Sequence, residues 1–173
     1  MQIVDRLDLP SGRYQLRAGV TSVRRQTSGS VYADLDVPDF SRDSLSLSGV
    51  ALDDPRTIRV VSAEAEGRLP PVVPMTTRAF DRTAKVASVV EMYQSVSANA
   101  QPVVMAVTIR DDREQAVFTA SKTIDAARFS ASRGVPFRFE LPLATLPTGE
   151  YLLTFDAKAG SATARRQVRF AVR

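Results

Sequence analysis

The chain has 173 residues, 44% of them hydrophobic, and carries a formal net charge of +4. This length suits one domain, or one domain and a fragment of another, and the hydrophobic content is enough for a packed core. Because the chain contains no Cys, His or Trp, its composition excludes disulfides, Cys/His metal sites and catalysis through a Cys or His nucleophile or base.

The N-terminal part of the chain predicts a β-hairpin. Apolar residues alternate with polar or small ones over residues 14–20, and the same alternation returns over residues 31–37. A period of two is typical of strands with one buried face, and the polar link 21–30 suits a hairpin loop. Pro38 and the polar residues around it break the pattern, so we expect a domain boundary after residue 42.

The rest of the chain, residues 43–173, predicts a series of short strands. We expect them at 45–50, 58–61, 77–80, 85–95, 103–110, 115–123, 136–141, 151–159 and 165–172. Strands that follow one another every 8–12 residues or so are typical of an immunoglobulin-like antiparallel β-sandwich. A Pro-rich loop at 53–76 interrupts the series, and only residues 125–133 have the pattern of a helical turn.

One stretch of sequence occurs twice, near the two ends of the chain. Leu9–Leu16, with the sequence LPSGRYQL, recurs as Leu146–Leu153, with the sequence LPTGEYLL, and an apolar strand follows each copy. The second copy is expected to close the sandwich. We therefore interpret residues 1–42 as the C-terminal strands of a preceding, incomplete immunoglobulin-like domain.

The repeated Gly-x-Tyr predicts a structural motif. Gly12 and Gly149 lie where a turn requires a positive φ, which glycine tolerates best. Tyr14 and Tyr151 come early in a strand, so each side chain is expected to pack inward and return its hydroxyl to a nearby backbone group, as in a tyrosine corner. An aromatic ligand contact is the functional alternative.

Acidic residues offer the main candidates for chemistry. Asp34, Asp36 and Asp39 alternate as oxygen ligands of Ca²⁺ could, but the loop that calcium motifs need is missing, which favours a solvated face. Nothing in the sequence brings the other acidic candidates together: Asp53-Asp54, Asp111-Asp112, Glu64, Glu66 and Glu91. We therefore assign no catalytic, cofactor-binding or metal-binding residue and expect no cofactor.

Basic residues are dense at two places, Arg24-Arg25 and Arg165-Arg166. Both pairs follow the repeated Tyr strand. Charged residues at exposed strand edges oppose aggregation, so we favour solvated edges over a site for an anionic ligand. We also expect no nucleic-acid partner. No apolar run reaches the roughly 20 residues of a membrane helix, so we expect no membrane insertion. Residues 1–10 do not have the pattern of a signal peptide.

Six stretches of the chain resemble a known family: 9–17, 30–40, 45–50, 78–81, 89–93 and 141–153. They are similar to the region downstream of the von Willebrand factor A domain in bacterial VWFA-related proteins, especially those common in Acidobacteria. The resemblance covers roughly residues 7–170 and implies non-catalytic β-sandwich modules of an exported multidomain protein. The metal-ion motif Asp-x-Ser-x-Ser of the A domain is absent, so the resemblance transfers no metal ligand.

Together these observations predict a non-catalytic structural or adhesive module of an exported bacterial protein, extracellular or periplasmic. We expect a protein partner or self-association through strand edges, and no small-molecule substrate. Cut off from its domain, the N-terminal hairpin would dock on the larger domain or on another chain by strand addition. Two alternatives stay open: a carbohydrate- or other ligand-binding sandwich, and an enzyme that works through Lys or carboxylates.

Overall fold

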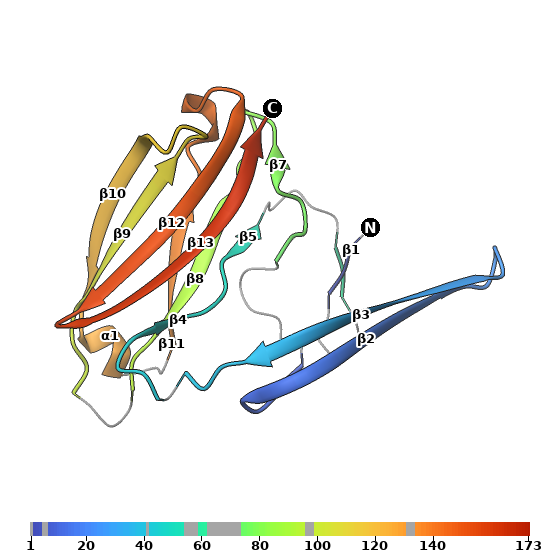
Figure 1. The fold of residues 1–173 in the computed structure, drawn as a ribbon, viewed down its shortest axis with the longest axis horizontal. Coiled ribbons are helices and arrows are strands. Elements are labelled where there is room, and N and C mark those ends of the chain that lie inside the picture. The colour runs from blue at the N-terminus through green and yellow to red at the C-terminus, as the bar shows by residue number, and fades with distance from the viewer. Residues whose placement is uncertain are drawn as a thin grey trace. The chain divides into compact units, whose positions relative to one another are not determined.

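The computed structural model describes residues 2–4, 7–40, 42–53, 59–61, 74–95, 99–130 and 134–173. The chain forms two compact units, residues 7–39 and residues 1–6 with 40–173 (Figure 1). Nearly all of its regular structure is β, which confirms the predicted all-β class. The strands are β1 (Gln2–Val4), β2 (Gly12–Ser22), β3 (Thr27–Val37), β4 (Ser46–Leu47), β5 (Ala51–Asp53), β6 (Arg59–Val61), β7 (Ala79–Phe80), β8 (Ala87–Tyr93), β9 (Val103–Arg110), β10 (Ala116–Ile124), β11 (Gly134–Glu140), β12 (Gly149–Ala159) and β13 (Ala162–Val172).

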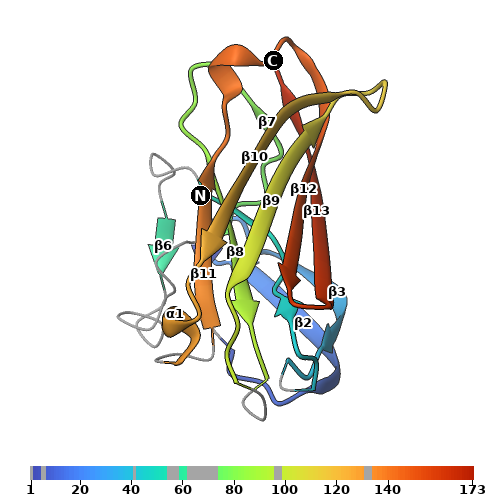
Figure 2. The same ribbon diagram turned by 90° about the vertical axis from the view of Figure 1, so that its left-hand side faces the viewer.

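The larger unit is an immunoglobulin-like sandwich of two sheets. One sheet has the strand order β10-β9-β12-β13-β7, and the other has β11 and β8 with β4 and β5 both paired to β8. All pairs in these sheets are antiparallel except β7–β13, which is parallel. Figures 1 and 2 show the two sheets as separate layers. The predicted fold class is therefore confirmed.

The hydrophobic core lies between the two sheets. Strand β9 buries the alternate side chains that the sequence predicts, namely Val103, Met105, Val107 and Ile109. Strand β8 is buried on both faces. Its buried polar residue, Ser88, donates a hydrogen bond of 2.9 Å to the Phe139 carbonyl, so the hydroxyl is satisfied inside the core.

The strand along one edge of β8 is interrupted by an extra residue. Leu47 lies opposite Met92 and Leu52 opposite Ser88, so five steps on one strand match four on the other. Between them, Ser48 donates its N–H to the Glu91 carbonyl, and its Oγ accepts the Glu91 N–H, both at 2.9 Å. The hydroxyl thus takes the place of a ladder carbonyl in a β-bulge, and both leucines are fully buried.

The smaller unit is the predicted hairpin. Strands β2 and β3 have 11 residues each and pair continuously from Gly12 opposite Val37 to Ser22 opposite Thr27. The loop is shorter than the predicted link 21–30, because its Thr and Ser residues continue the ladder and only residues 23–26 form the turn. Arg24-Arg25 lies in that turn, as expected.

The division between the two units falls after Asp39, and β1 pairs in parallel with β6, which places residues 1–6 with the larger unit. The interpretation of residues 1–42 as part of a preceding domain remains a prediction. Most of the Pro-rich loop 53–76 lies outside the described residues, which include β6 within the predicted strand 58–61. The end of the loop returns to the core, where Met75 is buried and its N–H donates to the Leu52 carbonyl.

Among the described residues, helical structure is limited to two short segments. Helix α1 (Ala127–Ser130) lies within the predicted turn 125–133, and Asp125 Oδ1 accepts the Ala127 N–H at 3.0 Å. A 3-10 helix, Leu143–Thr145, precedes β12. In the described part of the chain, no helix has the length and apolar character needed to cross a membrane.

Candidate functional site

Both copies of the repeated sequence form a tyrosine corner. Tyr151 donates a hydrogen bond of 2.7 Å to the Pro147 carbonyl, and Tyr14 donates one of 2.9 Å to the Pro10 carbonyl. The prediction of a structural role for both tyrosines is confirmed. Burial, and then the nearby negative charges of Asp111 and Asp112, raise the pKa of Tyr151 above its ordinary value, so the phenol stays a donor.

The expectation of positive φ holds at only one of the two glycines. Gly12 has a φ of 154°, whereas Gly149 is absent from the residues with positive φ. A Cβ built on Gly12 or Gly149 would lie 3.6–3.9 Å from the ring or hydroxyl of Tyr14 or Tyr151, which is an ordinary van der Waals contact, so only the φ of Gly12 favours glycine. The left-handed glycine of the second hairpin is Gly160, at φ 57°, in the turn between β12 and β13.

The hairpin β2–β3 has one polar face on which side chains pair across the strands. Arg13 and Asp36 form an ion pair at 3.9 Å, and Arg17 lies over the Tyr32 ring at 5.2 Å from its centroid. Gln15 donates a hydrogen bond of 3.4 Å to Asp34. These contacts between exposed groups mark this face as the solvent side of the hairpin.

The opposite face of the hairpin is apolar and exposed. Leu16, Val20 and Val31 lie on this face with relative exposures of 38%, 63% and 63%, and Leu35 is half-buried. We call these four residues the hairpin apolar face. At the matching position of the second hairpin, Leu153 is 0% exposed. The position of Leu16 is therefore covered in one unit and uncovered in the other, and an exposed apolar surface is typical of an interaction site.

The acidic candidates that the structure describes form no metal-binding group. Asp34 and Asp36 contact Gln15 and Arg13, as described, and no group of three acidic residues with metal-binding geometry occurs among the described residues. Asp54, Glu64 and Glu66 lie outside those residues. The buried carboxylate Asp53 is 3.8 Å from the Arg138 guanidinium.

The second basic pair lies on β13. Arg165 forms a hydrogen-bonded ion pair of 2.5 Å with Asp156 on the neighbouring strand, and this contact raises the pKa of Arg165 above its ordinary value. Arg166 donates to the Arg165 carbonyl. Both arginines are exposed, so the pair is a solvated strand surface, which is the interpretation favoured from the sequence.

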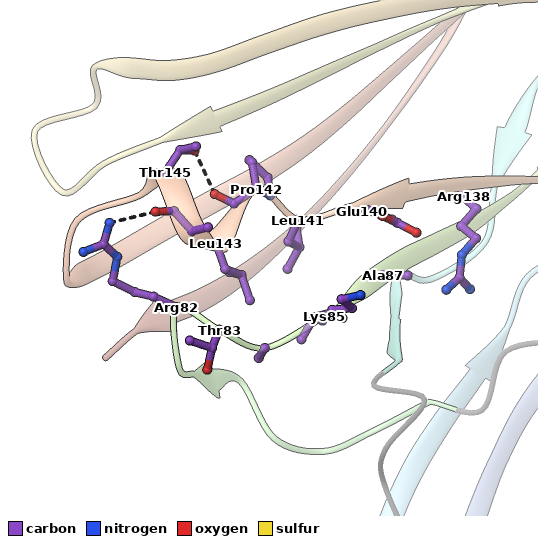
Figure 3. A pocket seen from close by; sticks show the side chains of 13 residues that line it. Arg82, Thr83, Lys85, Ala87, Arg138, Glu140, Leu141, Pro142, Leu143 and Thr145 are labelled. Atoms are coloured by element: carbon purple, nitrogen blue, oxygen red, sulfur yellow. Dashed lines mark hydrogen bonds between the residues drawn. The ribbon is translucent and has the colours of Figure 1, made fainter.

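The larger unit also contains a groove, shown in Figure 3. Its cavity volume is about 430 Å³, and its lining combines the start of β8 with the 3-10 helix. Arg82 and Arg138 lie at opposite ends of it in this view, with Lys85 between them, and Glu140 is its acidic lining residue. Arg82 donates a hydrogen bond of 2.7 Å to the Ala144 carbonyl, and this bond fixes one side of the guanidinium. The charge of the groove suits an anionic ligand.

An aromatic pair at the end of β8 was missed by the sequence reasoning. The Phe40 and Tyr93 rings stack with centroids 4.6 Å apart, and Tyr93 donates a hydrogen bond of 2.5 Å to Glu91. A Cβ on Gly134 would approach the Tyr93 ring to 2.9 Å, so only glycine fits beneath it. Because Phe40 covers one face of Tyr93, the pair packs the chain onto β8. The two residues are far apart in sequence, so no local pattern could have joined them.

No family model matches the chain, and the search of curated proteins finds no match. Among solved structures, the chain is similar to the C-terminal domain of Wzt, at 11% identity and a TM-score of 0.49, covering 77% of this chain and 75% of that one. It is also similar to a glycosyl hydrolase family 2 member from Bacteroides cellulosilyticus, at 11% identity and a TM-score of 0.46, covering 85% of this chain and 18% of the hydrolase. A third likeness, at 11% identity and a TM-score of 0.39, is to dimeric latent PorU from Porphyromonas gingivalis, covering 95% of this chain and 12% of PorU. The chain thus spans less than a fifth of the length of the last two proteins, and at this identity the likeness concerns the fold alone.

Proposed function

We propose that this chain is a non-catalytic structural or adhesive module of an exported multidomain bacterial protein, and that it works by holding protein partners through the hairpin apolar face and its strand edges. The observation that carries this proposal is the contrast between the two faces of β2–β3. One face has its polar groups paired across the strands, whereas the other exposes Leu16, Val20 and Val31 to solvent. Apolar side chains of this size gain about 1.5–3 kcal/mol each when they are fully buried.

Two further features support the proposal. The repeated sequence spans turn and strand residues in both units, and its tyrosines serve the backbone rather than a ligand. The sequence resemblance to the β-sandwich region of VWFA-related proteins points to the same class of module and to an exported protein.

The test uses two neighbouring residues of β3 that lie on opposite faces of the hairpin. Val31→Asp places a charge on the hairpin apolar face, and Ser30→Asp places the same charge on the polar face. The protein isolated from its native source is expected to sediment as part of a larger assembly, which Val31→Asp disrupts and Ser30→Asp preserves. A native protein that sediments as a free monomer, or an assembly that both variants tolerate, would refute the proposed role.

The groove supports a second candidate, a sandwich that binds an anionic carbohydrate. Its lining brings Arg82, Lys85 and Arg138 to one concave surface. Titration calorimetry with a glucuronate oligosaccharide should then give a binding signal that Lys85→Ala weakens. A wild-type chain that gives no heat of binding with this oligosaccharide removes the candidate.

A further inference from the structure

We propose that the outer edge of β10 is a docking site for an extended protein segment. The segment carries an acidic side chain opposite Lys122 and apolar side chains opposite Ala120 and Phe118, and it adds to the sheet as an antiparallel strand. The inference rests on the proposed function and deepens it, because it names one strand edge and the chemistry of the partner that this edge accepts.

Strand β10 is the border of the five-stranded sheet. In the part of the chain that the structure describes, it pairs only with β9, and Figure 1 shows it at the left-hand border of the sheet. The ladder is irregular at Val117 and regular from Phe118 to Ile124. A border strand presents a row of main-chain N–H and C=O groups along its outer side. This regular segment can therefore pair with an added strand.

The side chains that β10 turns toward the core are left largely uncovered. Residues paired across two strands lie on the same face, and the β10 partners of the four buried β9 side chains are Phe118, Ala120, Lys122 and Ile124. Of these four, only Ile124 is buried, whereas Phe118 is half-buried and the other two are exposed. The sandwich is therefore open along its β10 side.

The facing sheet is also incompletely covered on this side. Its border strand there is β11, and the Phe137 and Phe139 side chains of β11 are half-buried against the core. The rings of Phe118 and Phe139 meet with centroids 5.4 Å apart, so the borders of the two sheets come together at this point. Figure 2 views the sandwich from this side. An apolar side chain on an added strand would complete the aromatic cluster and remove its exposed surface from water.

Lys122 sets the charge of the partner. It lies opposite Met105, on the core side of the sheet, although its strand is at the border. An added strand with only apolar side chains would bury the ammonium group without a counter-charge, which costs free energy. A carboxylate opposite it forms an ion pair instead, so the lysine both rejects apolar strands and selects acidic ones.

The size of the neighbouring residues sets the rest of the pattern. Ala120 leaves room for a large side chain opposite it, and Phe118 calls for a smaller one, because cores pack to a constant density. An antiparallel partner therefore has the pattern Glu-x-Leu-x-Val, in which the x side chains face the solvent. The row on β10 contains no acidic residue, so the same row of a second copy offers Lys122 no carboxylate.

The experiment uses the purified 173-residue chain and the synthetic peptide Thr-Glu-Thr-Leu-Thr-Val-Thr. Hydrogen exchange is followed by mass spectrometry in fragments that cover β10, with fragments from β13 as an internal reference. At about 1 mM peptide, exchange in β10 should slow at least about threefold, as expected for a Kd below about 0.5 mM. Exchange in β13 should not change. Titration calorimetry gives the Kd.

A reversal of charge makes the result specific. Lys122→Glu should weaken binding of the Glu peptide at least about tenfold, and it should restore binding to a peptide with Lys in place of Glu. Lys158→Glu is the matched control, because it makes the same change at an exposed residue of β12, which lies between β9 and β13. This variant should keep the wild-type preference for the Glu peptide.

Unchanged exchange in β10 at this peptide concentration, or equal binding of the two peptides to the wild-type chain, overturns the inference. Protection of β10 that rises with protein concentration in the absence of peptide assigns the edge to a second copy and also overturns it. The proposed function fails separately. An assembly that Val31→Asp disrupts would still support that function if β10 binds no peptide, whereas a free native monomer would refute it even if β10 does.

Discussion

Replacing Tyr151 with Phe tests whether the tyrosine corner stabilises the sandwich. The change removes only the hydroxyl that donates 2.7 Å to the Pro147 carbonyl, while the ring keeps its stack with Phe170 at 5.5 Å between centroids. A typical hydrogen bond contributes a net amount of about 0.5–1.5 kcal/mol to the free energy of unfolding. The loss should lie near or above the upper end of this range, because the partly buried carbonyl is left without its donor. We expect a loss of about 1–2 kcal/mol in the free energy of unfolding, or roughly 4–8 °C in Tm for a unit of this size.

The chain supplies its own control for this measurement. Tyr14→Phe removes the same bond, at 2.9 Å, from an exposed site in the separate hairpin unit. Water can replace the lost donor there, so the unfolding transition of the sandwich should change by less than about 0.5 kcal/mol. Urea unfolding followed by circular dichroism measures both variants. Equal losses in the two variants, or no loss in Tyr151→Phe, would refute the reasoning.

Three further outcomes follow from burial, backbone geometry and ionisation. Leu153→Ala should lower the free energy of unfolding by about 2–5 kcal/mol in urea, because its side chain is fully buried. Leu16→Ala at the matching position should hardly change the unfolding transition of the sandwich. Similar losses in the two variants would contradict the difference in burial between the two leucines. Gly160→Ala should lower the free energy of unfolding by about 1–2 kcal/mol because of its φ of 57°. Gly49→Ala, whose added Cβ meets nothing within 4 Å, should lower it by no more than about 0.5 kcal/mol. Thermal melts measure both variants, and equal shifts in Tm would contradict the effect of backbone geometry. Burial and then the hydrogen bond and charge of Glu91 raise the pKa of Tyr93, so the unfolded chain loses this proton from about pH 10 while the folded chain retains it. The free energy of unfolding should therefore be unaffected at neutral pH and fall as the pH rises past 10. Tyr93→Phe should reduce that fall. Urea midpoints are measured at neutral pH and above pH 10, and a decrease that is equal in wild type and variant would contradict the assignment.

The strands and the corner motif could be predicted from the sequence because their causes are local. The period-two alternation predicted β9 and the hairpin strands. The repeat of Leu-Pro-x-Gly-x-Tyr predicted both tyrosine corners, since each tyrosine donates its hydrogen bond to a carbonyl only four residues earlier. The predicted hairpin link was too long because polar β-formers such as Thr27 and Ser28 continue the ladder, and hydrophobic alternation does not detect them.

The features that escaped prediction depend on contacts between distant residues. The Phe40–Tyr93 stack and the contact of Arg138 with Asp53 join segments that only the completed sheets bring together. Gly149 shows a different limit. The sequence predicted a glycine required by a positive φ, but the φ of Gly149 is not positive, and a Cβ there would make only ordinary contact with Tyr151, at 3.7–3.9 Å.

The bulge at Ser48 gives this edge one residue more than a regular ladder with β8 needs. Leu47 and Leu52 are five steps apart but lie opposite Met92 and Ser88, which are four steps apart, so removal of one residue between the leucines would leave a regular ladder with both side chains still on the core face. Most junctions between strands tolerate insertions and deletions. In a scan of single-residue deletions across the sandwich, this short segment should therefore behave like such a junction and tolerate a deletion, although it lies beside a core strand.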